Sequence, residues 1–268
     1  MPPLTRVRVV LLGGVILAAL LLFQIARPAR MVESAVQAKF ATFRGRIQFA
    51  GGVPIMAPVA TAVSQTSADL RLCGIEEVPN ESLIVDFRSH GIANVFVYLE
   101  KPPKGMPATL RQSQEPIVEF WQQDLRFVPH ALLLRTDQTL HVRQKDNVGH
   151  NAHFYTLRNP TFGEAIKASD EIVPRVFARP ERQPLQVKCD IHSWMQSWCL
   201  VLDHPYAAIT DANGAFEIAE LPTGTHEFTV WHERTGFLTR TLKVNIDGKT
   251  HPKSLEIRIP SSKFQRKH

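Results

Sequence analysis

The chain has 268 residues, of which 44% are apolar and 21% are charged. This length can bury a hydrophobic core in one or two domains. The 14 glycines and 19 prolines are ordinary usage, which excludes collagen-like and low-complexity chains. The net charge is +6. The lysines and arginines are spread along the chain and form no dense basic stripe, so we expect no nucleic-acid partner.

The N-terminal region predicts a targeting segment over residues 1–38. Arg6 and Arg8 precede an apolar run over residues 9–23. A basic start followed by such a run is typical of a secretory signal or a signal anchor. No small-residue cleavage site follows it directly, so we favour an uncleaved hydrophobic helix that attaches the chain to the membrane, with cleavage and secretion as the alternative. In both cases the rest of the chain is expected outside the cytoplasm, on the periplasmic side.

After residue 39 the sequence consists of short β-rich runs separated by turn residues, which predicts an all-β fold. No long amphipathic helical pattern appears there. Residues 50–80 and 101–114 are expected to be irregular. The expected strands are, in chain order, Phe43–Phe49, Ser82–Asp86, Ala93–Leu99, Ile117–Phe120, Ala131–Arg135, Thr139–Gln144, His153–Leu157, Glu171–Phe177, Leu185–Lys188, Met195–Leu202, Phe216–Ile218, Thr225–His232, Leu238–Asn245 and Leu255–Ile259.

The segment with the clearest chemistry begins at Cys189. His192 follows it by three residues and Met195 by six. A loop this short can direct a thiolate, an imidazole and a thioether toward one ion. Soft sulfur together with imidazole suits copper, and two histidines, one cysteine and a weak axial methionine form the blue-copper ligand set. We therefore predict a copper site that needs one more histidine.

The second histidine is expected in the segment that follows the predicted strand Thr139–Gln144. His150 is the favoured ligand, since Asn151 beside it can anchor the loop. His153 is the alternative, and the sequence pattern alone does not separate the two. The predicted metal ligands are thus His150, Cys189, His192 and Met195.

The segment from Phe127 to Met195 resembles the copper half of a cupredoxin of the plastocyanin/amicyanin family. The Cys189, His192 and Met195 spacing is similar to the short ligand loop of amicyanin, with Ser193 where proline is often found. The resemblance implies a cupredoxin-like Greek-key sandwich. It also implies one-electron transfer to redox partner proteins, with the outward face of His192 as the electron port.

The stretch from His204 to Glu233 resembles a carboxypeptidase-regulatory-like β-sandwich module. Its residues Asp211–Gly214 predict a hairpin turn. The strand at Gly45–Phe49 is compatible with either unit. The expected organisation is a targeting segment (1–38), a cupredoxin-like domain with an irregular N-terminal portion (39–202), the smaller sandwich (203–260) and a basic tail (261–268).

The leading hypothesis is an extracytoplasmic blue-copper electron carrier that is not an enzyme. One alternative is a structural or interaction protein in which the metal is a folding staple or absent, and another is a copper carrier for a redox enzyme. Hydrolase motifs such as Gly-x-Ser-x-Gly and His-Glu-x-x-His do not occur. In an oxidising compartment, a disulfide between Cys73 and Cys199 is an open possibility.

Overall fold

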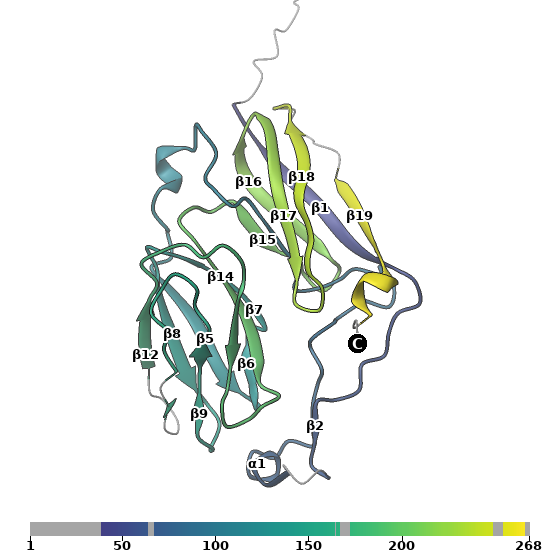
Figure 1. Ribbon diagram of the computed structural model, residues 1–268, viewed down its shortest axis with the longest axis vertical. Coiled ribbons are helices and arrows are strands. Elements are labelled where there is room, and N and C mark those ends of the chain that lie inside the picture. The colour runs from purple at the N-terminus through teal and green to yellow at the C-terminus, as the bar shows by residue number, and fades with distance from the viewer. Residues whose placement is uncertain (1–38, 64–66, 164, 167–171, 249–253, 266–268) are drawn as a thin grey trace, which may run out of the picture. The chain divides into compact units, whose positions relative to one another are not determined.

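The computed structural model describes residues 39–63, 67–163, 165–166, 172–248 and 254–265 (Figure 1). The hydrophobic helix expected within residues 1–38 lies outside these ranges. Among the described residues, no helix combines the length and the apolar character needed to cross a membrane.

The described chain is almost entirely β-structure, which confirms the predicted all-β class. Helical structure consists of α1 (Ser67–Leu72) and two 3-10 turns, η1 (Ala108–Leu110) and η2 (Ser261–Phe264). The strands are β1 (Phe40–Ala50), β2 (Ala60–Thr61), β3 (Glu77–Val78), β4 (Phe96–Tyr98), β5 (Ile117–Gln123), β6 (Arg126–Val128), β7 (Ala131–Arg135), β8 (Thr139–Gln144), β9 (His150–Asn151), β10 (His153–Phe154), β11 (Ala165–Ile166), β12 (Ile172–Val176), β13 (Leu185–Lys188), β14 (Gln196–Leu202), β15 (Ala207–Ile209), β16 (Ala215–Pro222), β17 (Gly224–His232), β18 (Gly236–Ile246) and β19 (Leu255–Pro260).

The first sandwich packs the sheet β12-β8-β5-β6 against the sheet β10-β13-β14-β7. Alternation explains the packing: in β8, Leu140, Val142 and Gln144 are buried, and the residues between them are partly exposed. Phe120 and Phe127 stack in the core with ring centroids 5.2 Å apart. This core contains Cys189 and Met195, so the predicted ligand loop is part of the sandwich interior.

The second sandwich packs the sheet β16-β1-β19 against the sheet β15-β4-β17-β18. Strand β1 runs antiparallel to β16 and parallel to β19. The buried side chains of Phe43, Ile47 and Phe49 point into this core, which explains why β1 belongs to the second sandwich. β1 and β4 lie within residues 39–202, the range expected for the cupredoxin-like domain. In the structure both belong to the second sandwich.

A separate apolar cluster joins the two sandwiches. It combines β4 and β17 of the second with β7 and β14 of the first. Trp198 packs on Trp231 with ring centroids 4.7 Å apart, and Trp231 also contacts Phe96. The strands that carry these residues bury apolar side chains on both faces, because one face belongs to a sandwich core and the other to this interface.

A tight turn is present at Asp211–Gly214, but it connects β15 to β16, which lie in different sheets, so the hairpin predicted there is not formed. The Asp211 carboxylate accepts the backbone N–H groups of Asn213 and Ala215, and Gly214 adopts a φ of 74°. The turn also touches Gly91, where a Cβ atom would lie 1.9 Å from the Asn213 carbonyl oxygen. Only glycine fits at residue 91 without moving backbone.

Two regions differ from expectation. Residues 82–86 form no strand beyond an isolated bridge between Val85 and Ile92. Within residues 50–80, β2 and β3 pair on either side of α1. We call this unit the cap; its described residues are 60–63 and 67–78. The local sequence pattern did not predict the cap, because the cap is stabilised by burial of the Leu70 side chain at its centre.

Candidate metal centre

The ligand loop joins two paired strands. The last pair of the β13–β14 ladder is Lys188 with Gln196, so residues 189–195 form the connection. The Cys189 N–H donates to the Met195 carbonyl at 3.2 Å, and the Met195 N–H donates to the His192 carbonyl at 2.9 Å. The His192 N–H donates to the Cys189 Sγ at 3.4 Å. These bonds fold the loop so that the Cys189 and His192 side chains face the same point.

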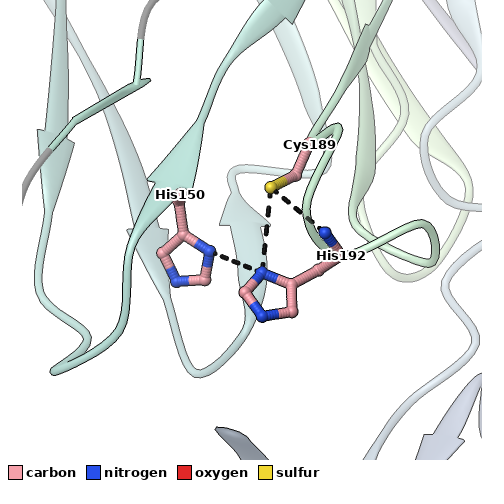
Figure 2. Close-up of side chains that lie close together, drawn as sticks. All are labelled: His150, Cys189 and His192. Carbon is pink, nitrogen blue, oxygen red and sulfur yellow. Dashed lines mark hydrogen bonds between the residues drawn. The ribbon is translucent and has the colours of Figure 1, made fainter. Parts of the chain in front are cut away.

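The structure brings His150 to that point from a different segment (Figure 2). His150 begins β9 and pairs with Ile166 of β11. Its Nδ1 lies 3.0 Å from the Nδ1 of His192, which in turn lies 3.8 Å from the Cys189 Sγ. One donor atom from each of the three residues lies within 4.8 Å of the others, and all three residues are buried.

The orientation of the two imidazole rings fits a bound cation. Nε2 of each ring is 2.9 Å from a carboxylate oxygen, of Asp146 for His150 and of Asp69 for His192. A carboxylate accepts, so each Nε2 carries the hydrogen and each Nδ1 is left to present a lone pair. Two lone pairs 3.0 Å apart require a proton or a metal ion between them.

The distances also suit a metal ion. Zn²⁺, for example, binds imidazole nitrogen at roughly 2.0 Å and thiolate sulfur at roughly 2.3 Å. The separations of 3.0 Å between the nitrogens and 3.8 Å between nitrogen and sulfur are shorter than the corresponding sums of two bonds. One ion can therefore contact both pairs.

The electrostatics of the site favour a thiolate. Burial raises the pKa of the Cys189 thiol, but the His150 and His192 rings, which donate from Nδ1 when they are protonated, and the backbone N–H groups of Asn151 and His192 outweigh it, lowering the pKa to about 6. The thiolate is the form of cysteine that binds metals. Burial lowers the pKa of both imidazoles, but the hydrogen bonds to the Cys189 sulfur and to their carboxylate partners outweigh it, so the pKa of each ring lies above its usual value.

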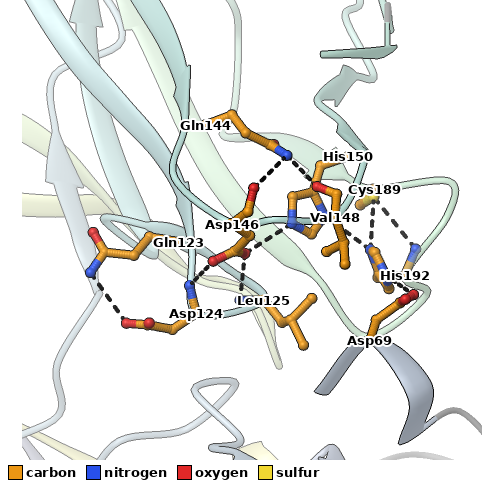
Figure 3. Close-up of polar contacts among 10 residues, drawn as sticks. All are labelled: Asp69, Gln123, Asp124, Leu125, Gln144, Asp146, Val148, His150, Cys189 and His192. Carbon is orange, nitrogen blue, oxygen red and sulfur yellow. Dashed lines mark hydrogen bonds and ion pairs between the residues drawn. The ribbon is translucent and has the colours of Figure 1, made fainter. Parts of the chain in front are cut away.

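Asp146 holds His150 from behind (Figure 3). Its carboxylate is buried and accepts the His150 Nε2–H together with the backbone N–H groups of Asp124 and Leu125 at 2.8 and 2.9 Å. Burial raises the pKa of Asp146, but these donors lower it below its usual value. Gln144 donates to the Val148 carbonyl and closes the loop that leads into β9.

The cap covers His192. Asp69 of α1 reaches its Nε2, and the side chain of His192 is only 3% exposed. The expectation that the outward face of His192 forms an open electron port is therefore wrong for this structure. The reason is packing. Leu70, Val78 and Leu125 belong to one buried cluster, and the partly buried Trp194 of the ligand loop packs against it, which holds the cap on the loop.

The remaining predicted residues fall into two groups. His153 lies outside the three-residue group: its Nδ1 is 3.2 Å from Asp190 and its ring stacks on Tyr155. Met195 is 1% exposed and belongs to the same core cluster as Cys189. Its role as a fourth ligand stays a prediction.

The three cysteines all lie within the described residues, and all are free thiols. Cys199 is fully buried in the first core, and Cys73 packs beside the cap cluster. The disulfide considered between them is therefore not formed. Burial raises the pKa of both thiols, which leaves Cys189 as the cysteine suited to metal binding.

Sequence reasoning missed both carboxylates that bind the histidines. Asp146 had a usable signal, since it stands four residues before His150 in the predicted loop. Asp69 had none, because it lies 123 residues before His192 in a segment expected to be irregular.

Comparison with protein-family models finds no match, and comparison with curated proteins finds none either. Parts of the chain are similar to solved copper proteins. A Cu-containing nitrite reductase (NirK) from Thermus scotoductus SA-01 shows 19% identity over 31% of this chain and 22% of that chain, with a TM-score of 0.28. A purple cupredoxin from Nitrosopumilus maritimus shows 16% identity over 31% and 98%, with a TM-score of 0.27. The oxidized state of a proline-to-alanine mutant of amicyanin shows 15% identity over 32% and 82%, with a TM-score of 0.29.

The chain thus spans less than a quarter of the nitrite reductase it resembles. Similarity this low and this partial does not assign a function. What the fold and the site define directly is an all-β sandwich protein with a buried His-Cys-His group suited to one soft metal ion.

Proposed function

We propose that this chain is an extracytoplasmic type 1 copper protein that carries single electrons between redox partner proteins, and that it is not an enzyme. The observation that supports this is the convergence of two imidazole Nδ1 atoms and one thiolate Sγ at a buried point. When bound, copper supplies one-electron chemistry by changing between Cu(I) and Cu(II).

The residues of this chain hold the site in place. Cys189 binds as a thiolate, and its sulfur accepts the backbone N–H of His192. Asp146 and Asp69 hold the two rings with Nδ1 inward. Because loop, rings and carboxylates are already hydrogen-bonded, little movement is needed when the charge at the centre changes, which favours rapid electron transfer.

Copper is proposed over zinc on the chemistry of the donors. Zinc accepts cysteine and histidine, but methionine is a poor zinc ligand and a recognised weak axial ligand of copper. Met195 is buried in the same cluster as Cys189 and is the proposed fourth ligand. The buried donors around the centre leave no position assigned to a substrate, which is why we propose an electron carrier.

The proposed location outside the cytoplasm rests on the sequence. The basic start and apolar run within residues 1–38 support an N-terminal membrane anchor on the periplasmic side. The redox partners are proposed to meet the protein there.

The test is a copper titration of the full chain purified in detergent. One equivalent of Cu(II) should produce an intense thiolate-to-copper absorption band that a mild reductant bleaches. The band should be absent from Cys189→Ser and retained by Cys199→Ala, which alters the fully buried cysteine outside the three-residue group.

A folded protein with a free Cys189 thiol that binds no copper would overturn the proposal. Tight binding of zinc with no coloured copper form would favour the alternative that the metal is a folding staple.

A further inference from the structure

The contact between Asp69 and His192 joins two distant parts of the chain. The Asp69 Oδ2 lies 2.9 Å from the His192 Nε2, although the residues are 123 positions apart. Nothing in the ligand loop itself supplies an acceptor to this nitrogen in the described structure. The cap therefore provides the hydrogen-bond acceptor for the His192 Nε2–H.

Asp69 is held in position by the rest of the cap. Its backbone carbonyl accepts the Cys73 N–H at 3.0 Å, which belongs to the turn of α1. Leu70, the next residue, is fully buried against Leu125 and Val148. Val148 lies two residues before His150, and Trp194, two residues after His192, packs against the same cluster, so the cap packs on the segments that carry both histidines.

The arrangement repeats the one at His150. There, Asp146 accepts the Nε2–H at 2.9 Å and Nδ1 points inward. A carboxylate on the outer nitrogen of a ligating imidazole fixes its tautomer and ring orientation and makes it a stronger donor. Each histidine thus has a carboxylate partner on its outer nitrogen: buried Asp146 from the adjacent loop and partly exposed Asp69 from the cap.

We propose that Asp69 is a positioning residue of the metal centre, which makes the cap part of the site. Its carboxylate holds the His192 ring with Nδ1 toward Cys189 and adds a negative charge beside the ion. This inference rests on the proposed copper function. A carboxylate near the centre favours the more highly charged Cu(II), so Asp69 should lower the reduction potential.

The experiment compares Asp69→Asn and Asp69→Ala with wild type in the full chain. Asparagine keeps the shape and an oxygen acceptor but removes the charge, whereas alanine removes both. Glu77→Gln is the matched control, because Glu77 is an exposed carboxylate of β3 in the same cap and does not contact His192 in the structure. The measurements are Cu(II) affinity by competition with a chelator, reduction potential, and solvent exchange of the His192 Nε2–H by NMR in the metal-free protein.

We expect Asp69→Ala to weaken Cu(II) affinity by about 10- to 100-fold and Asp69→Asn to weaken it less. Both variants should raise the reduction potential, and the Nε2–H should exchange faster with solvent in the alanine variant. Glu77→Gln should match wild type. Affinity, potential and exchange in the Asp69 variants equal to those of Glu77→Gln would overturn the inference.

The NMR measurement separates this inference from the proposed function. If wild type forms no thiolate-to-copper band, the copper function fails on its own. Asp69 is then still supported as the positioning partner of His192 if its replacement by alanine accelerates Nε2–H exchange, and rejected if exchange is unchanged.

Discussion

Asp146 hydrogen-bonds His150 through Nε2 at 2.9 Å and at the same time accepts two backbone N–H groups of the turn between β5 and β6. That turn is unusual, because Asp124 and Leu125 both adopt positive φ values, of 54° and 56°. Non-glycine residues seldom adopt this conformation unless other contacts hold them. One carboxylate therefore supports a strained turn and a histidine of the proposed metal centre together.

Replacing Asp146 by alanine should destabilise the metal-free protein by roughly 1–3 kcal/mol for each buried donor left unpaired. Chemical denaturation monitored by tryptophan fluorescence measures this loss. Asp137→Ala is the control. Asp137 also accepts a backbone N–H, from Ser113, but its side chain is one-third exposed, so its removal should cost less free energy of unfolding than removal of Asp146. Equal losses in the two variants would contradict the role given to Asp146.

The seating of the cap on the ligand loop depends on Leu70. Its side chain is fully buried, so Leu70→Ala should cost about 2–5 kcal/mol of local stability and speed amide hydrogen exchange within the cap. Leu72→Ala lies on the same helix but is 67% exposed, and its effect should stay within about 0.5 kcal/mol. Hydrogen exchange by mass spectrometry compares the two, and similar exchange rates would refute the packing argument.

Acid should destabilise the second sandwich through His232. Burial lowers the pKa of this imidazole to about 4, while in the unfolded chain it titrates near 6.5. Between these values the unfolded state binds the additional proton, so stability falls as the pH decreases from about 6.5 to 4. The contribution is on the order of 3 kcal/mol.

His232→Phe should flatten this acid dependence, because phenylalanine does not titrate. Unfolding midpoints measured at several pH values between about 4 and 7 check the expectation. His204, whose pKa burial also lowers to about 4, should contribute in the same direction and remain in the variant. An unchanged slope in His232→Phe would show that His232 is not the titrating group.

The approach of Gly91 to the Asp211–Gly214 turn excludes a side chain. In Gly91→Ala the new Cβ would stand 1.9 Å from the Asn213 carbonyl oxygen, which is backbone and has little freedom to move. We expect a loss of at least about 1–3 kcal/mol, seen as a lower melting temperature. Gly52→Ala has no atom within 4 Å of the new Cβ and should leave the melting temperature close to wild type.

The sequence by itself determined the all-β class and most strand positions, because alternation of buried and exposed residues is a local property. Thr139–Gln144 and Leu185–Lys188 were expected with the bounds that the structure shows. It also indicated that the Cys189 and His192 side chains are neighbours, because the two residues are only three positions apart in a short loop.

Tertiary structure alone decided the rest of the centre. His150 and His153 are equivalent by pattern, and only packing buries the first and leaves the second against Asp190 near the surface. The cap is the clearest case: six helical residues have no stable fold of their own, so α1 forms where burial of Leu70 stabilises it. That burial places Asp69 on a histidine 123 residues away, a contact that no local spacing encodes.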